Sequence, residues 1–250
     1  MEPNEYERMY QVENRHWWYL GMAAITSDLL NHSMGPAASR KILDAGCGTG
    51  AAMSTYLAGY GSVTGFDISP LALRWCQARN LTRLARASVT EVPFRSDSFD
   101  LVTSFDVLYE QAVIKDSLAM NEFFRVLKPG GFLMLRLPAY NWLRGHHDVT
   151  IHTARRYTTN EVTRLLAESG FRTARISYAN TILFPLALAK RLSERIWPPA
   201  PDSSDLSVNF GVFNGLFKLI LCSEAPLVTR MGLPFGLSVL ALGQKPYANQ

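Results

Sequence analysis

The sequence predicts an α/β protein with a mostly parallel β-sheet covered by helices on both faces. Short apolar segments at 41–45, 62–67 and 99–104 have the length of buried strands, and segments with helical signals separate them. This alternation is typical of parallel sheets, because each crossover places a helix on one face. The chain has 250 residues, 48% of them hydrophobic, which is enough for one large globular domain.

The first strand-helix-strand unit carries the clearest local signals. The strand at 41–45 runs into a cluster of glycines, and a helix at 51–59 is expected before the second strand at 62–67. Ser69 and Pro70 then open a helix that extends to about residue 80, because proline is favoured in the first helical turn.

The second half of the sheet follows from the same kind of signal. A weak strand at 83–87 precedes the stronger one at 99–104, and the helix near 115–127 ends where a lysine, a proline and two glycines follow. The remaining predicted elements are a strand at 132–137, a helix from the capping box of Thr158 and Glu161 to Gly170, and strands at 171–178 and 237–244.

Two segments fall outside this alternation. Residues 1–30 form an N-terminal helical segment rich in aromatic side chains. Residues 180–236 separate the last two strands and contain two apolar stretches, at 182–197 and 210–222. Because structureless loops of that length are uncommon in compact domains, we expect the insertion to form helices.

A glycine-rich turn joins the first strand to the first helix. Gly46 and Gly48 allow the backbone to approach a ligand closely, and Gly50 allows the helix to pack tightly on the strand. The free N–H groups at the start of the helix favour a carboxylate or phosphate. Asp67, at the end of the second strand, is placed to bind both hydroxyls of a ribose. The turn therefore predicts a nucleotide-type cofactor rather than a plain tight turn.

The spacing of the glycines discriminates between cofactors. The pattern is G-x-G-x-G, with Asp44 two positions before the first glycine and Ala51 after the last. A dinucleotide fingerprint would be G-x-G-x-x-G. The spacing therefore disfavours a nicotinamide cofactor, although such a cofactor would bind at the same edge of the sheet.

Four motifs in the right order resemble the class I S-adenosylmethionine-dependent methyltransferases of the type 11 group. They lie at 43–50, 65–69, 92–102 and 125–131. The similarity covers about residues 40–178, and residues 238–245 fit the last strand of that family. The resemblance implies a Rossmann-like, doubly wound sheet of seven strands in which the last strand is antiparallel.

The resemblance also implies roles in cofactor binding. The turn from Gly46 through Cys47 to Gly48 would hold the methionine part of S-adenosylmethionine, with Asp44 near its ammonium group. Asp67 would bind the ribose hydroxyls, and Ile68 would pack on the adenine.

Two further pairs of positions complete the implied site. Ser88 and Val89 would meet the adenine edge, where the family often has an acidic residue; the serine departs from that pattern and brings no charge. Phe105 and Asp106 would face the methyl group and the acceptor.

Methyl transfer needs alignment more than covalent catalysis, because the sulfonium methyl is already activated. A general base is needed only for a hydroxyl or a protonated amine. Candidates are His146, His147 and Asp148, which follow the fifth strand near its carboxyl end, although a polar loop is the plainer interpretation. The spacing matches no metal-ligand pattern, so no metal is expected.

Several aromatic residues belong to the predicted acceptor side or lid: Trp17, Trp18, Tyr19, Tyr109 and Tyr140. The first three have two interpretations, as the packing face of a helix or as a lid that excludes water. For 180–236, a helical cap is the simplest interpretation. A pocket for a lipid-like acceptor, an oligomer interface and peripheral membrane contact stay open.

We expect a single domain over 1–250, with an N-terminal lid at 1–35, a cofactor-binding core at 40–179, the insertion at 180–236 and the last strand at 237–245.

Bulk properties limit the partners and the compartment. The net charge is +4 and the basic residues are scattered without a nucleic-acid-binding motif, so no nucleic acid is expected. The three cysteines lie far apart and form no disulfide pattern, the N-terminus is acidic, and no apolar run reaches membrane-spanning length. These features predict a cytoplasmic monomer or homodimer.

The predicted reaction is methyl transfer from S-adenosylmethionine, with S-adenosylhomocysteine as product, to a small-molecule or lipid-like acceptor. Oxygen is favoured as the acceptor atom, and nitrogen and carbon stay open. Two alternatives come from other classes: a nicotinamide-dependent oxidoreductase and a non-catalytic partner protein built on the same fold.

Overall fold

The computed structural model describes residues 3–35, 37, 39–145, 153–196, 211 and 213–247. Within these ranges seven strands form one sheet in the order β3-β2-β1-β4-β5-β7-β6. The strands are β1 (Arg40–Ala45), β2 (Gly61–Asp67), β3 (Leu84–Arg86), β4 (Phe99–Phe105), β5 (Leu127–Pro138), β6 (Arg172–Ala179) and β7 (Ser238–Gln244). The first five are parallel, and β7 is antiparallel to both of its neighbours. The predicted fold class is confirmed.

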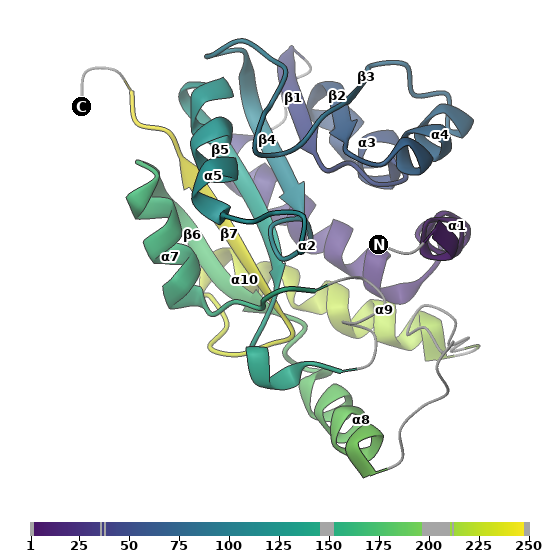
Figure 1. Cartoon of the computed structure of the whole chain (residues 1–250). Coiled ribbons are helices and arrows are strands. Elements are labelled where there is room, and N and C mark those ends of the chain that lie inside the picture. The colour runs from purple at the N-terminus through teal and green to yellow at the C-terminus, as the bar shows by residue number, and fades with distance from the viewer. Residues whose placement is uncertain are drawn as a thin grey trace.

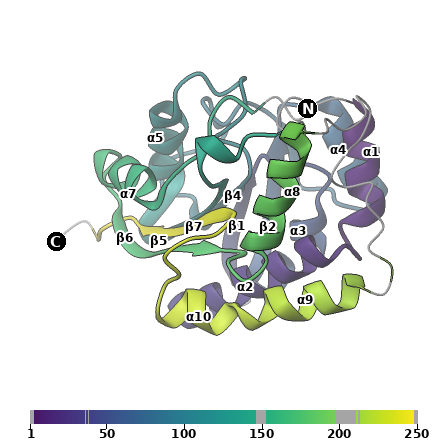
Figure 2. The same ribbon diagram turned by 90° about the horizontal axis from the view of Figure 1, so that it is seen from below.

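Helices cover both faces of the sheet (Figures 1 and 2). They are α1 (Pro3–Val12), α2 (Trp17–Met34), α3 (Ala51–Ser54), α4 (Pro70–Ala78), α5 (Asp116–Val126), α7 (Thr159–Glu168), α8 (Phe184–Ile196), α9 (Phe213–Ser223) and α10 (Ala225–Arg230), with short 3-10 turns at Leu57–Tyr60 and Asn141–Leu143. On one face, Phe123 of α5 and Leu166 of α7 are fully buried in a core cluster with the strands. On the other, α2, α9 and α10 pack in a second cluster.

The insertion between β6 and β7 is helical, as predicted, and it divides into two parts. Helices α9 and α10 pack along α2, where Leu221 and Val228 are fully buried. Burying this apolar surface away from water stabilises the fold, so α9 and α10 belong to the main core. Helix α8 differs, because Leu186 and Leu192 are about half exposed, at 57% and 49%. Among the helices of the described ranges, none has the length and apolar composition needed to cross a membrane.

Three local elements differ from the sequence prediction. The helix expected at 51–59 ends at Ser54, because the chain turns through Thr55 into a 3-10 turn that buries Leu57 in the second core. The N-terminal segment is two helices, and His16 caps the second by accepting a hydrogen bond from the Trp18 amide. Strand β5 begins at Leu127 instead of 132, because tertiary pairing of Leu127 with Phe99 extends the strand through the predicted turn.

The packing of α9 on α2 depends on the missing side chain of Gly21. A Cβ atom at Gly21 would lie 2.5 Å from Leu221 Cδ2, whereas a Cβ at Gly215 of α9 would meet nothing within 4 Å. We therefore expect Gly21→Ala to lower the free energy of unfolding by about 1–2 kcal/mol through overpacking. In the matched control, Gly215→Ala should raise it by about 0.5–1 kcal/mol, because alanine is the better helix former. Urea denaturation of both variants measures the two effects; equal changes would contradict the packing of α9 on Gly21.

Candidate active site

A cavity of about 1120 Å³ opens at the carboxyl ends of β1, β2, β4 and β5. Helices α1 and α2 supply part of its wall, and α8 supplies another part through Leu186 and Lys190. In Figure 1 these three helices lie beyond the tip of the β4 arrow. This is the edge at which ligands bind in open α/β sheets, and it is the edge that the sequence predicted.

The glycine turn after β1 is fastened to the end of β2. The N–H groups of Gly46 and Cys47 both donate to the carbonyl oxygen of Phe66 at 2.9 Å. The Gly48 N–H donates to the Asp67 carboxylate at 3.0 Å. Gly46 has a φ of +76°, and a Cβ there would collide with Val107, so the turn requires glycine at this position. The turn thus brings the end of β1 beside Asp67.

Asp67 also accepts a hydrogen bond from the Ser69 N–H at 2.9 Å, and it is 9% exposed. Its burial raises the pKa of the carboxyl, and the hydrogen bonds from Ser69 and Gly48 oppose that rise. Ile68 follows it in the cavity wall with half of its surface exposed. The carboxylate and the exposed side chain beside it offer a polar and an apolar contact to one ligand.

Ser88 and Val89 line the same end of the cavity. The Ser88 hydroxyl is engaged locally: it shares a hydrogen bond of 2.8 Å with the Thr90 hydroxyl and accepts another from the Thr90 N–H. Val89 is 6% exposed and belongs to the first core cluster.

Asp44 lies in the cavity wall one residue before the end of β1. It is 2% exposed and accepts a hydrogen bond from the Thr103 hydroxyl at 2.7 Å. Burial raises the pKa of Asp44 to about 6, against the opposing influence of Thr103 and the positive charge of Arg136. A second buried carboxylate is therefore placed at the glycine turn.

Arg136 of β5 forms a partly buried ion pair with Asp106. Its Nε donates to the Asp106 carboxylate at 2.6 Å, and the guanidinium carbon lies 4.8 Å from the ring centre of Trp18 and 4.9 Å from that of Phe105. Asp106 has a φ of +57°, an uncommon conformation for a residue other than glycine, at the carboxyl end of β4. Desolvation raises the pKa of Asp106, and Arg136 counters the rise. The pair and both rings line the cavity.

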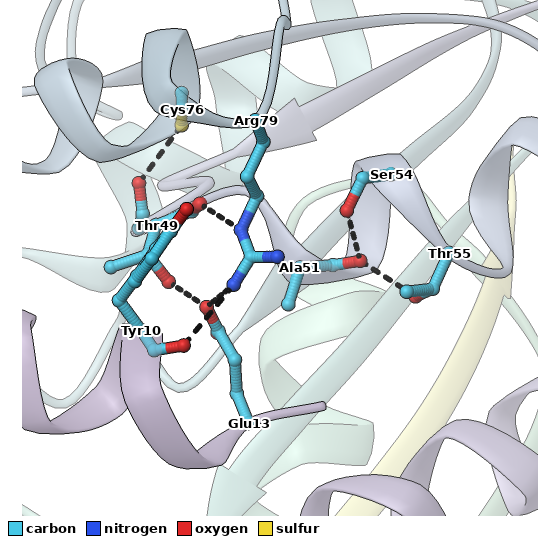
Figure 3. Close-up of polar contacts among 9 residues, drawn as sticks. Tyr10, Glu13, Thr49, Ala51, Ser54, Thr55, Cys76 and Arg79 are labelled. Atoms are coloured by element: carbon cyan, nitrogen blue, oxygen red, sulfur yellow. Dashed lines mark hydrogen bonds and ion pairs between the residues drawn. The ribbon is translucent and has the colours of Figure 1, made fainter. Parts of the chain in front are cut away.

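The N-terminal helix is latched over the glycine turn (Figure 3). Glu13, just beyond α1, accepts a hydrogen bond from the Thr49 hydroxyl and pairs with Arg79 at 2.5 Å. Arg79 also donates to the Thr49 carbonyl and stacks on Tyr10. Both charged side chains are under 10% exposed, so breaking the pair would leave a buried charge. The sequence did not single out Glu13 or Arg79, because their partners lie 36 and 66 residues away.

The junction of α1 and α2 is held from the insertion. The Asn214 side chain of α9 accepts from the Trp17 N–H and donates to the Arg15 carbonyl, both at 2.9 Å. Helix α9 thereby fixes the point at which the chain turns from α1 into α2.

The far end of the cavity is apolar with a cationic border. Leu143, Leu183 and Leu186 contribute apolar wall, and Phe217 of α9 closes on Trp17 with ring centres 5.6 Å apart. Lys190 and Arg191 of α8 also line this region, and both pair with Glu194. Nothing in the local sequence predicted that α8 would line this cavity.

Most predicted site residues meet in this one cavity. They are Asp44, Gly46, Cys47, Gly48, Asp67, Ile68, Ser88, Val89, Phe105, Asp106, Tyr109, Trp17, Trp18 and Tyr19. Two lie elsewhere: Gly50 faces Leu81 and Cys76, and Tyr140 stacks on Tyr178 with ring centres 5.1 Å apart. His146, His147 and Asp148 lie outside the described residues. In the part of the chain that is described, no group of three or more metal-ligating side chains is found.

The structure adds cavity residues that the pattern did not reveal. Arg136 sits within an apolar strand, where its spacing carries no signal. Glu110 follows β4, and burial raises its pKa to about 7.

Comparisons with known proteins agree with this geometry. Residues 43–135 match the family model of a methyltransferase domain. The demethylmenaquinone methyltransferase of Clavibacter sepedonicus is 32% identical over 108 residues, which cover 41% of this chain and 43% of that protein. The chain thus spans less than half the length of that relative.

Two solved structures share the fold. One is a chain of the complex between the Haloferax volcanii Trm112 methyltransferase activator and a candidate methyltransferase, with a TM-score of 0.63, 18% identity, and coverage of 99% of this chain and 96% of that one. The other is geranyl diphosphate methyltransferase in complex with GPP and sinefungin. It has a TM-score of 0.59 and 13% identity, and the match covers 88% of this chain and 76% of that one. Residues 43–135 thus resemble a methyltransferase domain, and the chain shares the fold of these two solved structures.

Proposed function

We propose that the protein transfers a methyl group from S-adenosylmethionine to a small molecule with a large apolar body. One observation carries the proposal: a single cavity contains both the Asp67 carboxylate, beside the glycine turn, and an apolar wall at Leu143 and Leu183. The first suits a nucleoside, and the second suits a greasy acceptor. S-adenosylmethionine, when bound, supplies an activated methyl group on a sulfonium sulfur.

The residues of the glycine turn fit that cofactor. Asp67 accepts hydrogen bonds, as a ribose diol requires, and the exposed face of Ile68 offers an apolar surface to adenine. Asp44 is a buried carboxylate, and within the described chain Thr103 is the side chain that donates a hydrogen bond to it. An ammonium group of the ligand would supply a positive charge beside it.

The chain would contribute alignment and the exclusion of water. Trp17, Trp18 and Tyr19 line the cavity, and the latch at Glu13 holds α1 over the glycine turn. A covered site keeps the acceptor atom in line with the reacting bond and strengthens the electrostatic contacts around it. Both interpretations of the aromatic run are compatible with this placement, because Trp17 and Trp18 also pack against the second core cluster.

We propose oxygen as the acceptor atom and an amphipathic, lipid-like or aromatic molecule as the acceptor. A hydroxyl must lose its proton on transfer, and Asp106 and Glu110 are carboxylates in the cavity wall that could accept it. Burial brings the pKa of Glu110 to about 7, which suits a proton acceptor near neutral pH. Demethylmenaquinone and geranyl diphosphate, which the similar proteins are named for, also have apolar bodies.

Three predictions about the surroundings of the protein stay predictions. They are the cytoplasmic location, the monomeric or homodimeric state, and peripheral membrane contact through 180–236. The half-exposed Leu186 and Leu192 on α8, near Lys190, support the last of these.

Calorimetric titration separates the proposal from its two alternatives. We expect micromolar binding of S-adenosylmethionine and S-adenosylhomocysteine and no comparable binding of NAD. Asp67→Ala should weaken binding of the first two by roughly 10- to 100-fold, because hydrogen bonds to a charged group are lost. The exposed Glu168→Ala on α7 serves as the control, with unchanged affinity. A preference for NAD would support an oxidoreductase, and no binding of any of the three would support a non-catalytic partner.

The pH dependence of binding tests the role of Asp44. Burial places its pKa at about 6 without ligand, and an ammonium partner needs the ionised carboxylate. The affinity for S-adenosylhomocysteine should therefore be constant above about pH 7 and fall below pH 6, by up to about tenfold per pH unit. Asp44→Asn should bind more weakly and lose this dependence. Methylthioadenosine, which lacks the amino-acid group, should show little of it; an equal fall for both ligands would contradict the assignment.

The acceptor class can be read from transferred label. Incubation with methyl-labelled S-adenosylmethionine and fractionated cell extract should place the label in organic-soluble molecules, because the far wall of the cavity is apolar. Mass spectrometry and NMR of the product then identify the methylated atom, with an O-methyl group expected. Label confined to protein or nucleic acid would rule out the proposed acceptor class, and an N- or C-methyl product would correct the acceptor atom.

A further inference from the structure

Four N–H groups of the glycine turn are already engaged within the protein. Those of Gly46 and Cys47 bond to Phe66, that of Gly48 bonds to Asp67, and that of Gly50 bonds to the Cys47 carbonyl. A ligand carboxylate could reach them only by displacing these bonds. As the turn stands, these four N–H groups do not support the expectation that it binds the anionic group.

Helix α3 does not restore that expectation. It has only four residues, Ala51–Ser54, and ends at Thr55. So short a run of aligned peptide dipoles gives little positive potential at its start. A cationic side chain is the stronger partner for the carboxylate of an amino-acid ligand.

Four cationic side chains line the cavity among the described residues: Arg136, Arg156, Lys190 and Arg191. Lys190 and Arg191 belong to α8 and share Glu194, and Arg156 donates to the Ala139 carbonyl. Of the four, Arg136 is the one carried by the central strands: Asp44 of β1 pairs with Thr103 of β4, and Phe105, two residues further along β4, pairs with Arg136. It is therefore the cation placed at the glycine-turn end of the cavity.

Among the described residues, the guanidinium of Arg136 is hydrogen-bonded to the protein through Nε only. Nε is bonded to Asp106, and the rings of Trp18 and Phe105 lie within 5 Å of the guanidinium carbon. Within the described part of the chain, Nη1 and Nη2 make no hydrogen bond, although the residue lines the cavity. Two parallel N–H donors on such an edge match the two oxygens of a carboxylate.

We propose that Arg136 binds the α-carboxylate of the S-adenosylmethionine methionine group while Asp44 binds its ammonium group. The two protein groups have opposite charges and line the same cavity near the carboxyl ends of β1 and β5, as the two groups of an α-amino acid require. Asp106 is then a positioning residue, because it holds Nε and leaves the other edge of the guanidinium for the ligand. The inference rests on the proposed function, since it assigns one contact within that cofactor site.

The test varies the ligand carboxylate and Arg136 together. Calorimetry compares S-adenosylhomocysteine with its decarboxylated analogue, 5′-S-(3-aminopropyl)-5′-thioadenosine; neither carries a sulfonium charge. The wild-type chain should prefer S-adenosylhomocysteine by about 10- to 100-fold. In Arg136→Met this preference should fall to about threefold or less, while the affinity for the decarboxylated analogue changes little. Arg136→Lys keeps the charge but not the paired donors, so its preference should be intermediate.

Two further measurements keep the result interpretable. Arg136→Met leaves Asp106 without its partner, so the double variant Arg136→Met/Asp106→Asn removes the stranded charge and should show the same lost preference. Arg164→Met on the exposed face of α7 is the matched control and should keep the wild-type preference. Because each variant is compared with itself on two ligands, a general loss of stability does not imitate the effect.

The outcomes separate this inference from the function on which it rests. If the wild-type chain binds S-adenosylhomocysteine and Arg136→Met keeps the full preference for the carboxylate, the role of Arg136 is wrong and the proposed function stands. If the wild-type chain binds neither nucleoside, both are wrong.

Discussion

The Asp67 carboxylate is the constraint on which the rest of the site depends. By accepting from Gly48 and Ser69, it ties the glycine turn after β1 to the start of the segment after β2. The same turn bonds through Gly46 to the last residues of β2. These hydrogen bonds hold the carboxyl ends of β1 and β2 together, and the cavity opens beside them. A group that stabilises the turn is thus also the group offered to the ribose, so the fold and the proposed chemistry depend on one side chain.

Electrostatics at the cofactor end of the cavity follow from burial. Asp44, Asp67 and Asp106 are desolvated carboxylates, and Arg136 of the cavity wall pairs with Asp106 and acts on Asp44. The carboxylates outnumber this cation, so the local charge favours a ligand with positive groups. S-adenosylmethionine has two, the ammonium and the sulfonium, and one negative group. The balance of charges in the wall is complementary to the balance in that ligand.

The insertion before β7 has two structural roles, one in the core and one in the cavity wall. Helices α9 and α10 bury apolar surface against α2, and Asn214 holds the junction from which α1 extends over the site. The N-terminal helices and the insertion are therefore linked by hydrogen bonds, although 197 residues separate Asn214 from Trp17. Helix α8 instead adds apolar and cationic side chains to the far wall of the cavity. In the proposed function, acceptor choice and the placement of α1 over the site would thus depend on the same segment.

The sequence alone determined the alternation of strands and helices, the glycine turn, and the two carboxylates Asp44 and Asp67. These features depend on local spacing along β1, β2 and their loops. The sequence could not locate Glu13, Arg79 or Arg136, since their meaning comes from partners brought near by the fold. Tertiary structure also removed Gly50 and Tyr140 from the cavity wall and ended the helix after the turn at Ser54. The physical reason is the same in each case: periodicity reports which face of an element is buried, whereas the partner of a buried charge depends on packing between elements distant in the chain.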